Sequence, residues 1–426
     1  MVILLLGAPF ILPTIVAVLG LIAVFGRSGL IAALAGWGPD IYGPQGVILA
    51  HVFFNLPLAI RLILQGWLTI PGERLRLAAS LGFGAGDTLR LLEWPMLRAV
   101  VPGVALVIFL ICTTSFAVAL ALGGGPRSTT VELAIYQAFR FDFDLGRAAM
   151  LGGIQLALGA AAAVLAAKLA LPAGMGAGLD RAVRRWDSDG WLRGQDALCI
   201  IAACAFLLTP MGTVLARGVP FVADLPAAVW WAALRSAVIA VAAAVLTSAL
   251  ALAMALAVAR GRAWVEVIGT LAVAASPLVL GVGLYLLILP VANPVGLALP
   301  VTAAVNVVLA LPFALRALIP ASRTLLADYG RLSSSLGLRG WPWLRLVAWP
   351  RLRAPLGYAA GLTAALSAGD LGVIALFARP GDATLPLALY QLMGSYRMGE
   401  AMAAACLLVA LALGLFWAFE RGTRDA

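Results

Sequence analysis

Apolar runs of about twenty residues with few charges recur along the whole chain, and they constrain the fold more than any other feature. Folded as a helix, such a run spans the hydrocarbon core of a bilayer, which is about 30 Å thick. Membrane β-strands are shorter and alternate in polarity, whereas these runs are long and do not alternate. We therefore predict an all-α fold, a polytopic transmembrane helical bundle. Ten candidate spans follow, at residues 1–26, 45–66, 98–122, 147–171, 196–216, 228–258, 265–290, 299–319, 354–378 and 399–419.

Composition agrees with a chain solvated by lipid. Hydrophobic residues make up 63% and charged residues 11%, against about 45–50% and about 25% in soluble domains. The net charge of +10 would favour a nucleic-acid partner in a soluble protein, but here the cations lie between apolar runs. We therefore expect membrane lipid, and no nucleic acid, as a partner. Four cysteines lie in apolar segments without metal-ligand spacing, so we expect small buried side chains and no metal site.

One polar, arginine-rich phrase occurs twice. "RLAASLGFGAGDTLRLLEWPMLRA" at 76–99 and "RLSSSLGLRGWPWLRLVAWPRLRA" at 331–354 align without a gap and share 13 of 24 positions. We call these the first and second repeated segments. With both on one face of the membrane, that face holds 18 arginines in its connections and the other holds 7. The positive-inside rule then places both segments, and the C-terminus, in the cytoplasm.

The repetition extends beyond these segments. "LPLAIRLI" at 56–63 matches "LPFALRAL" at 311–318 with the same offset of 255, and "LAIYQ" at 133–137 matches "LALYQ" at 387–391. Because paired elements keep the same orientation, we predict a parallel repeat with a pathway between its halves. The predicted organisation is a first half at 1–171, a cytoplasmic linker at 172–195 and a second half at 196–426.

The first half has no counterpart of the spans at 196–258. The chain also begins inside an apolar run that has no basic leader and no cleavage site. We therefore expect the first run to be a retained span, and the natural start to lie upstream, with a first half that is naturally shorter as the alternative.

Each repeated segment carries a glycine and, 13 residues later, a proline: Gly82 and Pro95, then Gly337 and Pro350. Glycine ends a short helix cheaply because it adopts left-handed backbone angles. The following stretch has apolar residues at helical spacing and interfacial tryptophans, and proline can begin the next span. We predict a short helix, a bend and an interfacial helix. The alternative is an ordinary amphipathic loop.

These segments resemble the "EAA" loops of ABC-importer permeases, in which Glu-Ala-Ala is followed by a glycine and then a proline. In that family the loop docks in a groove of the ATP-binding subunit. The glycines and prolines match; the alanine positions hold Ala78 and Ser333, and arginine replaces the glutamate, at Arg76 and Arg331. Because arginine stands in its place, a salt bridge made by the family's glutamate is not carried over to this chain. It covers essentially the whole chain and implies the type I ABC-importer permease fold.

Within that family the chain is most similar to the thiamine branch, through "HVFFNLPLAIRLILQ" and "TSFAVALALGGGPRSTTVELAIYQ", with the ferric-iron branch second. The resemblance implies import of thiamine or its phosphates across the bacterial cytoplasmic membrane. It also implies two ATP-binding cassette subunits, which carry ATP and Mg²⁺, and a periplasmic substrate-binding protein. The chain itself is predicted to be no enzyme and to hold no cofactor.

Residue patterns offer little enzyme chemistry. His51 is the lone histidine and has no partner at metal-ligand spacing, so packing or a hydrogen bond within its span is expected. "GGGP" at 123–126 lacks the Lys-Ser/Thr of a phosphate loop and is interpreted as a turn. A secondary transporter and a lipid-binding scaffold remain as alternatives of other classes.

Acidic side chains inside the membrane are costly and usually functional, and Asp370 stands out among them; its repeat counterpart is Ser115. The family resemblance implies that this span lines the translocation path, where a carboxylate suits a passing thiazolium cation. A hydrogen bond that shapes a gate is the alternative for Asp370. On the opposite face from the repeated segments, polar residues could meet a binding protein or could simply be solvated: Arg140, Asp142, Asp144 and Glu400.

Overall fold

The computed structural model describes residues 12–123, 129–169, 190–272, 275–379 and 381–424, and these residues are helical with no strand among them. The helices of the first half are α2 (Thr14–Phe25), α3 (Leu30–Ala35), α4 (Pro44–Trp67), α5 (Gly72–Ser80), α6 (Ala85–Thr88), α7 (Trp94–Thr113), α8 (Phe116–Leu122), α9 (Val131–Arg140) and α10 (Leu145–Leu169). The remainder are α11 (Gly190–Gly218), α12 (Ala227–Ala259), α13 (Ala263–Leu271), α14 (Pro277–Ile288), α15 (Ala298–Ser335), α16 (Gly340–Trp343), α17 (Trp349–Ala368), α18 (Gly372–Phe377), α19 (Leu385–Gly394) and α20 (Met398–Arg424).

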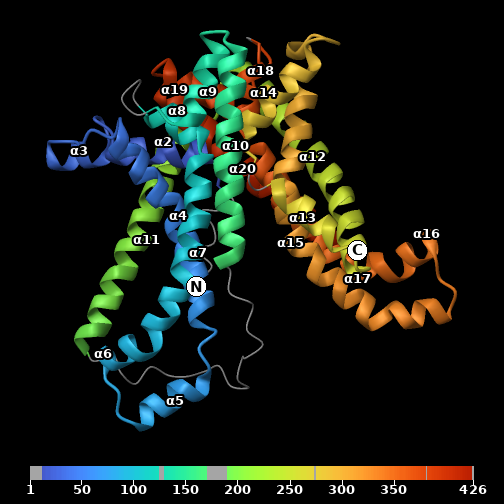
Figure 1. Cartoon of the computed structure of the whole chain (residues 1–426). Helices are drawn as coiled ribbons and strands as arrows, with labels where there is room; N and C mark the ends of the chain where they lie inside the picture. The colour runs from blue at the N-terminus through green and yellow to red at the C-terminus, as the bar shows by residue number, and fades with distance from the viewer. Residues whose placement is uncertain (1–11, 124–128, 170–189, 273–274, 380, 425–426) are drawn as a thin grey trace.

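Two groups of long helices spread apart from a shared layer (Figure 1). One group contains α4, α7 and α10, and the other contains α12, α15 and α17 with the short helix α13 beside them. The long helix α11 packs on α2 and α20. Short helices α8, α9, α14, α18 and α19 gather in the shared layer at the top of the view. At the opposite end, α5 and α6 form the foot of one group and α16 lies at the foot of the other. The helices therefore converge at one end of the molecule and diverge toward the end that carries the repeated segments.

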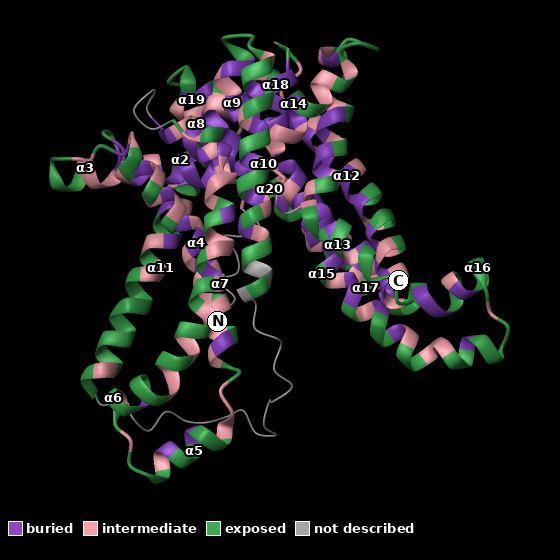
Figure 2. Ribbon diagram, viewed as in Figure 1, coloured by how far each residue is buried: buried purple, intermediate pink, exposed green. Residues whose placement is uncertain are grey.

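The largest core cluster occupies the shared layer. It joins α2 and α9 from the N-terminal part of the chain to α14, α18, α19 and α20 from the C-terminal part. Buried residues concentrate in this layer and between α12, α15 and α17, whereas the lower ends of the long helices are exposed (Figure 2). Because lipid rather than water covers a spanning helix, these exposed apolar faces are compatible with a membrane protein.

Among the described residues, nine stretches are long and apolar enough to cross a membrane, which confirms the helical, polytopic class. The predicted span at 265–290 is wrong as one continuous helix: it consists of α13 and α14, separated near residue 272. Two other predicted spans, 98–122 and 354–378, are each broken before their last turns. Length and hydrophobicity alone do not reveal such breaks.

Two threonines precede the first break. The hydroxyls of Thr113 and Thr114 donate to the carbonyl of Leu110 at 2.9 and 3.1 Å. Such bonds back to the preceding turn compete with regular helix geometry. Backbone angles then leave the helical region at Ser115, whose ψ is 80°. In the second break Gly369 packs so closely on Pro13 that a Cβ there would lie 2.8 Å from the Pro13 Cβ.

Pro95 and Pro350 do not restart the chain as separate helices, which corrects the sequence interpretation. In each copy a short helix, a π-helical turn and the next long helix follow one another without a break. Proline occupies the second position of that long helix. Proline lacks an N–H and its ring crowds the carbonyl four residues earlier, so the preceding turn widens. The second copy also has no separate short helix: α15 runs for 38 residues through 331–335.

Parts of three sequence predictions lie outside the described residues. These are the first eleven residues of the first span, most of the "GGGP" turn, and the linker from residue 172 to residue 189.

Candidate functional site

Both repeated segments turn at their glycine in the same way. Gly82 has φ +70° and Gly337 has φ +65°. The N–H of Phe83 donates to the carbonyl of Ala78 at 3.0 Å, and the N–H of Leu338 donates to the carbonyl of Ser333 at 2.9 Å. Each helix therefore ends in a Schellman motif, in which a left-handed residue lets the chain bond back across the last turn.

The two segments also share their helix boundaries at the offset of 255. Three pairs of elements match: Ala85–Thr88 with Gly340–Trp343, the π-helical turns Leu89–Glu93 with Leu344–Ala348, and Trp94–Thr113 with Trp349–Ala368. These coincidences support the parallel repeat inferred from the sequence. The symmetry axis itself stays a prediction.

The arginine position and the small-residue position of the motif have different surroundings. Arg76 is exposed and lies 3.6 Å from the carboxylate of Glu73, one turn earlier on the same helix. Arg331 is exposed on the last turns of α15. Ala78 and Ser333 are buried, with 2% and 4% of their surface exposed. The small residue is therefore packed inside the molecule, while the arginine lies on its surface.

Each repeated segment presents a pair of exposed leucines that sequence reasoning missed. Leu77 and Leu81 are 59% and 63% exposed, and their counterparts Leu332 and Leu336 are 54% and 65% exposed. Residues four apart on a helix share one face, so each pair forms a small apolar stripe. The signal was present in the sequence, because all four leucines are identical at the offset of 255.

Ser115 and Asp370 occupy equivalent places in the two helix breaks. Ser115 precedes α8 and its side chain caps no N–H. Asp370 precedes α18, and its Oδ1 accepts the N–H of Gly372 at 3.2 Å. Its other oxygen, Oδ2, is buried and has no hydrogen-bond partner. The structure thus brings both predicted path residues to the shared layer, one in each half.

A second buried acid, Glu132, lies in the same layer. It is 0% exposed, and the side-chain amide of Gln155 on α10 donates to its Oε1. The same amide donates to the carbonyl of Thr113 at 3.1 Å. Sequence reasoning missed Glu132 because it follows Thr-Thr at a helix start, where an acid usually caps in solvent.

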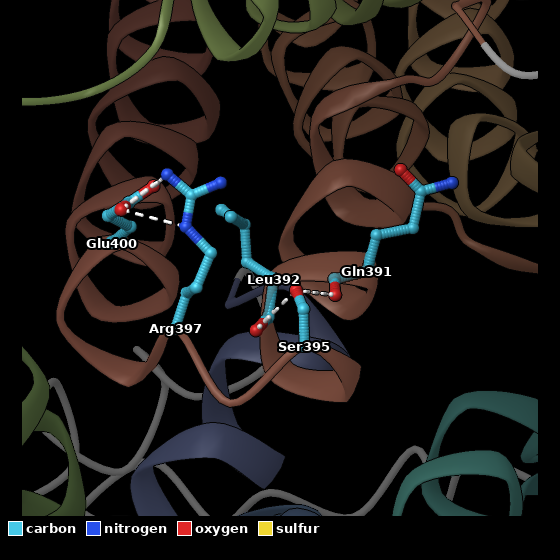
Figure 3. A network of polar contacts seen from close by, with 5 residues as sticks. All are labelled: Gln391, Leu392, Ser395, Arg397 and Glu400. Carbon is cyan, nitrogen blue, oxygen red and sulfur yellow. Dashed lines mark hydrogen bonds and ion pairs between the residues drawn. The ribbon is translucent and has the colours of Figure 1, made fainter.

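Charged residues opposite the repeated segments pair locally. Arg397 donates to Glu400 through Nε at 2.9 Å, across the turn from α19 to α20 (Figure 3). Ser395 in that turn donates to the carbonyls of Gln391 and Leu392. In the corresponding turn of the first half, Arg147 lies 3.7 Å from Asp142, and Asp144 accepts the Arg147 N–H.

The predictions about histidine and cysteine meet mixed outcomes. His51 lies in α4 with its buried Nε2 unpartnered, which leaves packing as its observed role. Only Cys406 is buried; Cys199 is exposed, contrary to expectation, because it lies in the exposed N-terminal part of α11. Within the described ranges no three His, Cys, Asp or Glu side chains gather as a metal site would require.

A polytopic helical chain with breaks in matched spans and two matched polar segments has the architecture of a membrane transport protein. Comparison with known proteins gives the particular family. The chain is 40% identical to the thiamine transport system permease protein ThiP of Salmonella typhimurium, over 96% of this chain and 80% of that protein. It is 39% identical to ThiP of Escherichia coli, with the same coverage, and 38% identical to ThiP of Brucella abortus strain 2308, over 98% of this chain and 79% of that protein.

The chain therefore belongs to the family of ThiP transport permeases, a multi-pass membrane family. These relatives support the thiamine branch of the resemblance, and the ferric-iron alternative is not supported. No family model matches the chain. No solved structure matches it either.

Proposed function

We propose that this chain forms the membrane pathway of an ATP-driven importer of thiamine or its phosphates. The observation that carries the proposal is the identity of 38–40%, over 96–98% of this chain, to proteins named for thiamine transport. The chain supplies the pathway, and hydrolysis of ATP with Mg²⁺ takes place on partner subunits. Its two halves, 1–171 and 196–426, are joined by the linker 172–195.

The repeated segments are the docking elements for two ATP-binding cassette subunits. The leucine pairs support this assignment, because an exposed apolar stripe beside arginines suits a protein groove that covers it. Arg76, Ala78, Gly82 and Pro95 shape the first docking element. Arg331, Ser333, Gly337 and Pro350 shape the second. Two elements at the feet of two helix groups suit a motor made of two ATPase subunits that close on each other.

The bacterial cytoplasmic membrane is the proposed location, with the repeated segments and the C-terminus in the cytoplasm. Their arginine excess supports this orientation. The packed layer then faces the periplasm, and a substrate-binding protein delivers thiamine there. Arg140, Asp142, Asp144 and Glu400 lie in the turns that this partner meets. The spread of the helix groups at the end assigned to the cytoplasm supports an inward-facing state (Figure 1).

Transport requires the packed layer to open when the ATPase subunits draw the two feet together. Ser115 and Asp370 sit at helix breaks in this layer, where the backbone can change direction at low cost. Thiamine carries a permanent positive charge on its thiazolium ring, so the free carboxylate oxygen of Asp370 attracts the passing cation.

The test is uptake of labelled thiamine by proteoliposomes that contain the chain with its ATPase, the substrate-binding protein outside and ATP inside. We expect accumulation that needs ATP and no ion gradient. Accumulation driven by an ion gradient without the ATPase would show a secondary transporter and overturn the proposal. A deletion strain that requires thiamine provides the matching growth assay, with a chain carrying both Gly82→Val and Gly337→Val as the uncoupled control.

A further inference from the structure

Three short helices, α9, α14 and α18, pack together in the shared layer. Contacts at both of their ends show that they run in the same direction. At their N-terminal ends, Ser276 before α14 lies beside the carboxyl group of Glu132 in the first turn of α9. Pro277 of α14 also lies against Gly372 of α18. At their C-terminal ends, aromatic rings of all three helices meet.

The polar end of this trio contains two acids. The Oε2 of Glu132 is buried and has no hydrogen-bond partner. The side-chain amide of Gln155 donates to Oε1 only, and Ser276 lies beside the carboxyl group. Asp370 is the second acid, and its Oδ2 is likewise buried without a partner. Pro277 Cβ and Asp370 Oδ1 lie 2.8 and 3.6 Å from the point that a Cβ on Gly372 would occupy. Both acids therefore flank the N-terminal turn of α14.

The apolar end of the trio is aromatic. The ring of Phe139 on α9 meets the ring of Tyr285 on α14 edge-on, with centroids 4.7 Å apart. The same Tyr285 ring lies 5.6 Å from that of Phe377 on α18. Nine residues separate Ser276 from Tyr285, so the aromatic end lies about 13 Å from the acid end along α14. On the proposed orientation, the aromatic end is nearer the periplasm.

The boundary between the two halves of the chain passes through this trio. α9 belongs to the first half, while α14 and α18 belong to the second. Separation of the halves would leave Glu132 and Phe139 on one wall, and Asp370, Tyr285 and Phe377 on the other. Each wall would thus carry one carboxyl group and at least one aromatic ring.

A purely structural role explains these acids poorly. A buried carboxyl group with an unpartnered oxygen costs free energy, and an amide or an apolar residue in its place would avoid that cost. The cost is repaid if the oxygens gain a partner when the layer opens. Aromatic faces and carboxylates together select an organic cation, the rings through cation–π attraction and the acids through charge.

We propose that Glu132, with Asp370, forms a two-carboxylate site that receives the substrate's cationic ring after it leaves the aromatic trio Phe139, Tyr285 and Phe377. The site is closed in this state and is assembled from both halves. The inference rests on the proposed import of thiamine, whose thiazolium ring is such a cation. It adds Glu132 as a residue that selects for charge.

The experiment compares thiamine with an uncharged analogue, in which a neutral aromatic ring replaces the thiazolium, in the proteoliposome assay. For each variant, uptake of each solute is divided by wild-type uptake, so that the preference of the binding protein cancels. Glu132→Gln should lower thiamine uptake roughly tenfold more than analogue uptake, as expected for one lost charge contact. Asp196→Asn, an exposed acid on α11 far from the trio, is the matched control and should change neither.

Further variants keep the inference testable if Glu132→Gln inserts poorly. Glu132→Asp retains the charge and should retain selectivity even at reduced total uptake. Phe139→Leu keeps an apolar side chain but removes the ring face, and should lower thiamine uptake more than analogue uptake. The inference is overturned if the wild type takes up thiamine but Glu132→Gln and Phe139→Leu each lose uptake of both solutes equally. That result leaves the proposed function standing. Absence of ATP-dependent thiamine uptake in the wild type overturns the proposed function itself.

Discussion

Replacement of Gly82 by valine tests whether the backbone turn of the first repeated segment is a docking determinant. Gly82 has φ +70°, and a Cβ added there would meet nothing within 4 Å. The substitution is therefore free of steric collision within the chain, and its cost is backbone strain alone. A residue with a Cβ pays about 1–2 kcal/mol in the left-handed region. That cost is too small to prevent membrane insertion.

The strain should appear as weaker binding of the ATPase. If docking requires the left-handed turn, a cost of about 1–2 kcal/mol lowers the affinity roughly 5- to 30-fold. Gly337→Val should have the same kind of effect at the second segment, where φ is +65° and the space is equally open. The two losses need not be equal, because the segments differ between glycine and proline. The assay is titration of purified ATPase subunit onto the permease in lipid nanodiscs, with uptake measured in parallel.

Two control variants separate strain from bulk. Gly82→Asn adds a side chain of a type that tolerates left-handed angles, so it should keep most of the affinity. Gly86→Val places valine on the same segment, where a Cβ also meets nothing within 4 Å and no positive φ is required. Wild-type affinity and uptake in both Gly82→Val and Gly337→Val would refute the reasoning and leave the segments as membrane anchors. An equal loss in Gly86→Val would show that bulk, not the turn, is what matters.

Three further predictions concern the remaining parts of the molecule. Asp370→Asn keeps an oxygen that can accept the N–H of Gly372, so it should slow thiamine uptake roughly tenfold while ATPase assembly stays intact; unchanged uptake at limiting and saturating thiamine would assign Asp370 to the capping role alone. The double variant Leu77→Ser and Leu81→Ser removes an exposed stripe and should leave stability within about 0.5 kcal/mol but reduce ATPase co-purification; full co-purification would exclude the stripe from the interface. Gly361→Val should lower the free energy of unfolding by about 1–3 kcal/mol, because a Cβ there lies 2.8 Å from the carbonyl oxygen of Phe416 on α20. In the control Gly414→Val the added Cβ meets nothing within 4 Å. Equal melting temperatures of the two variants would contradict the packing argument.

Much of this protein follows from short stretches of sequence. The membrane class follows from runs long enough to span a bilayer, since lipid leaves the helix as the only arrangement that satisfies every backbone group of a single segment. The turns at Gly82 and Gly337 were predicted because glycine's freedom at positive φ is a property of the residue itself. The repeat was visible because identical residues recur at a constant offset. Each of these signals is local or is a comparison of the chain with itself.

Other features depend on which helices come together. The break at Gly369 exists where Pro13, distant in sequence, packs against it. Glu132 has the sequence context of an ordinary solvent-exposed helix start, and only the packing of α10 and α14 around α9 buries it. Exposure of the leucine pairs likewise depends on how the feet of the two helix groups stand clear of their neighbours (Figure 2). A sequence determines how long an apolar run is and where a backbone can bend. The burial of an individual side chain is set by contacts between residues far apart in the chain, so only the tertiary structure decides it.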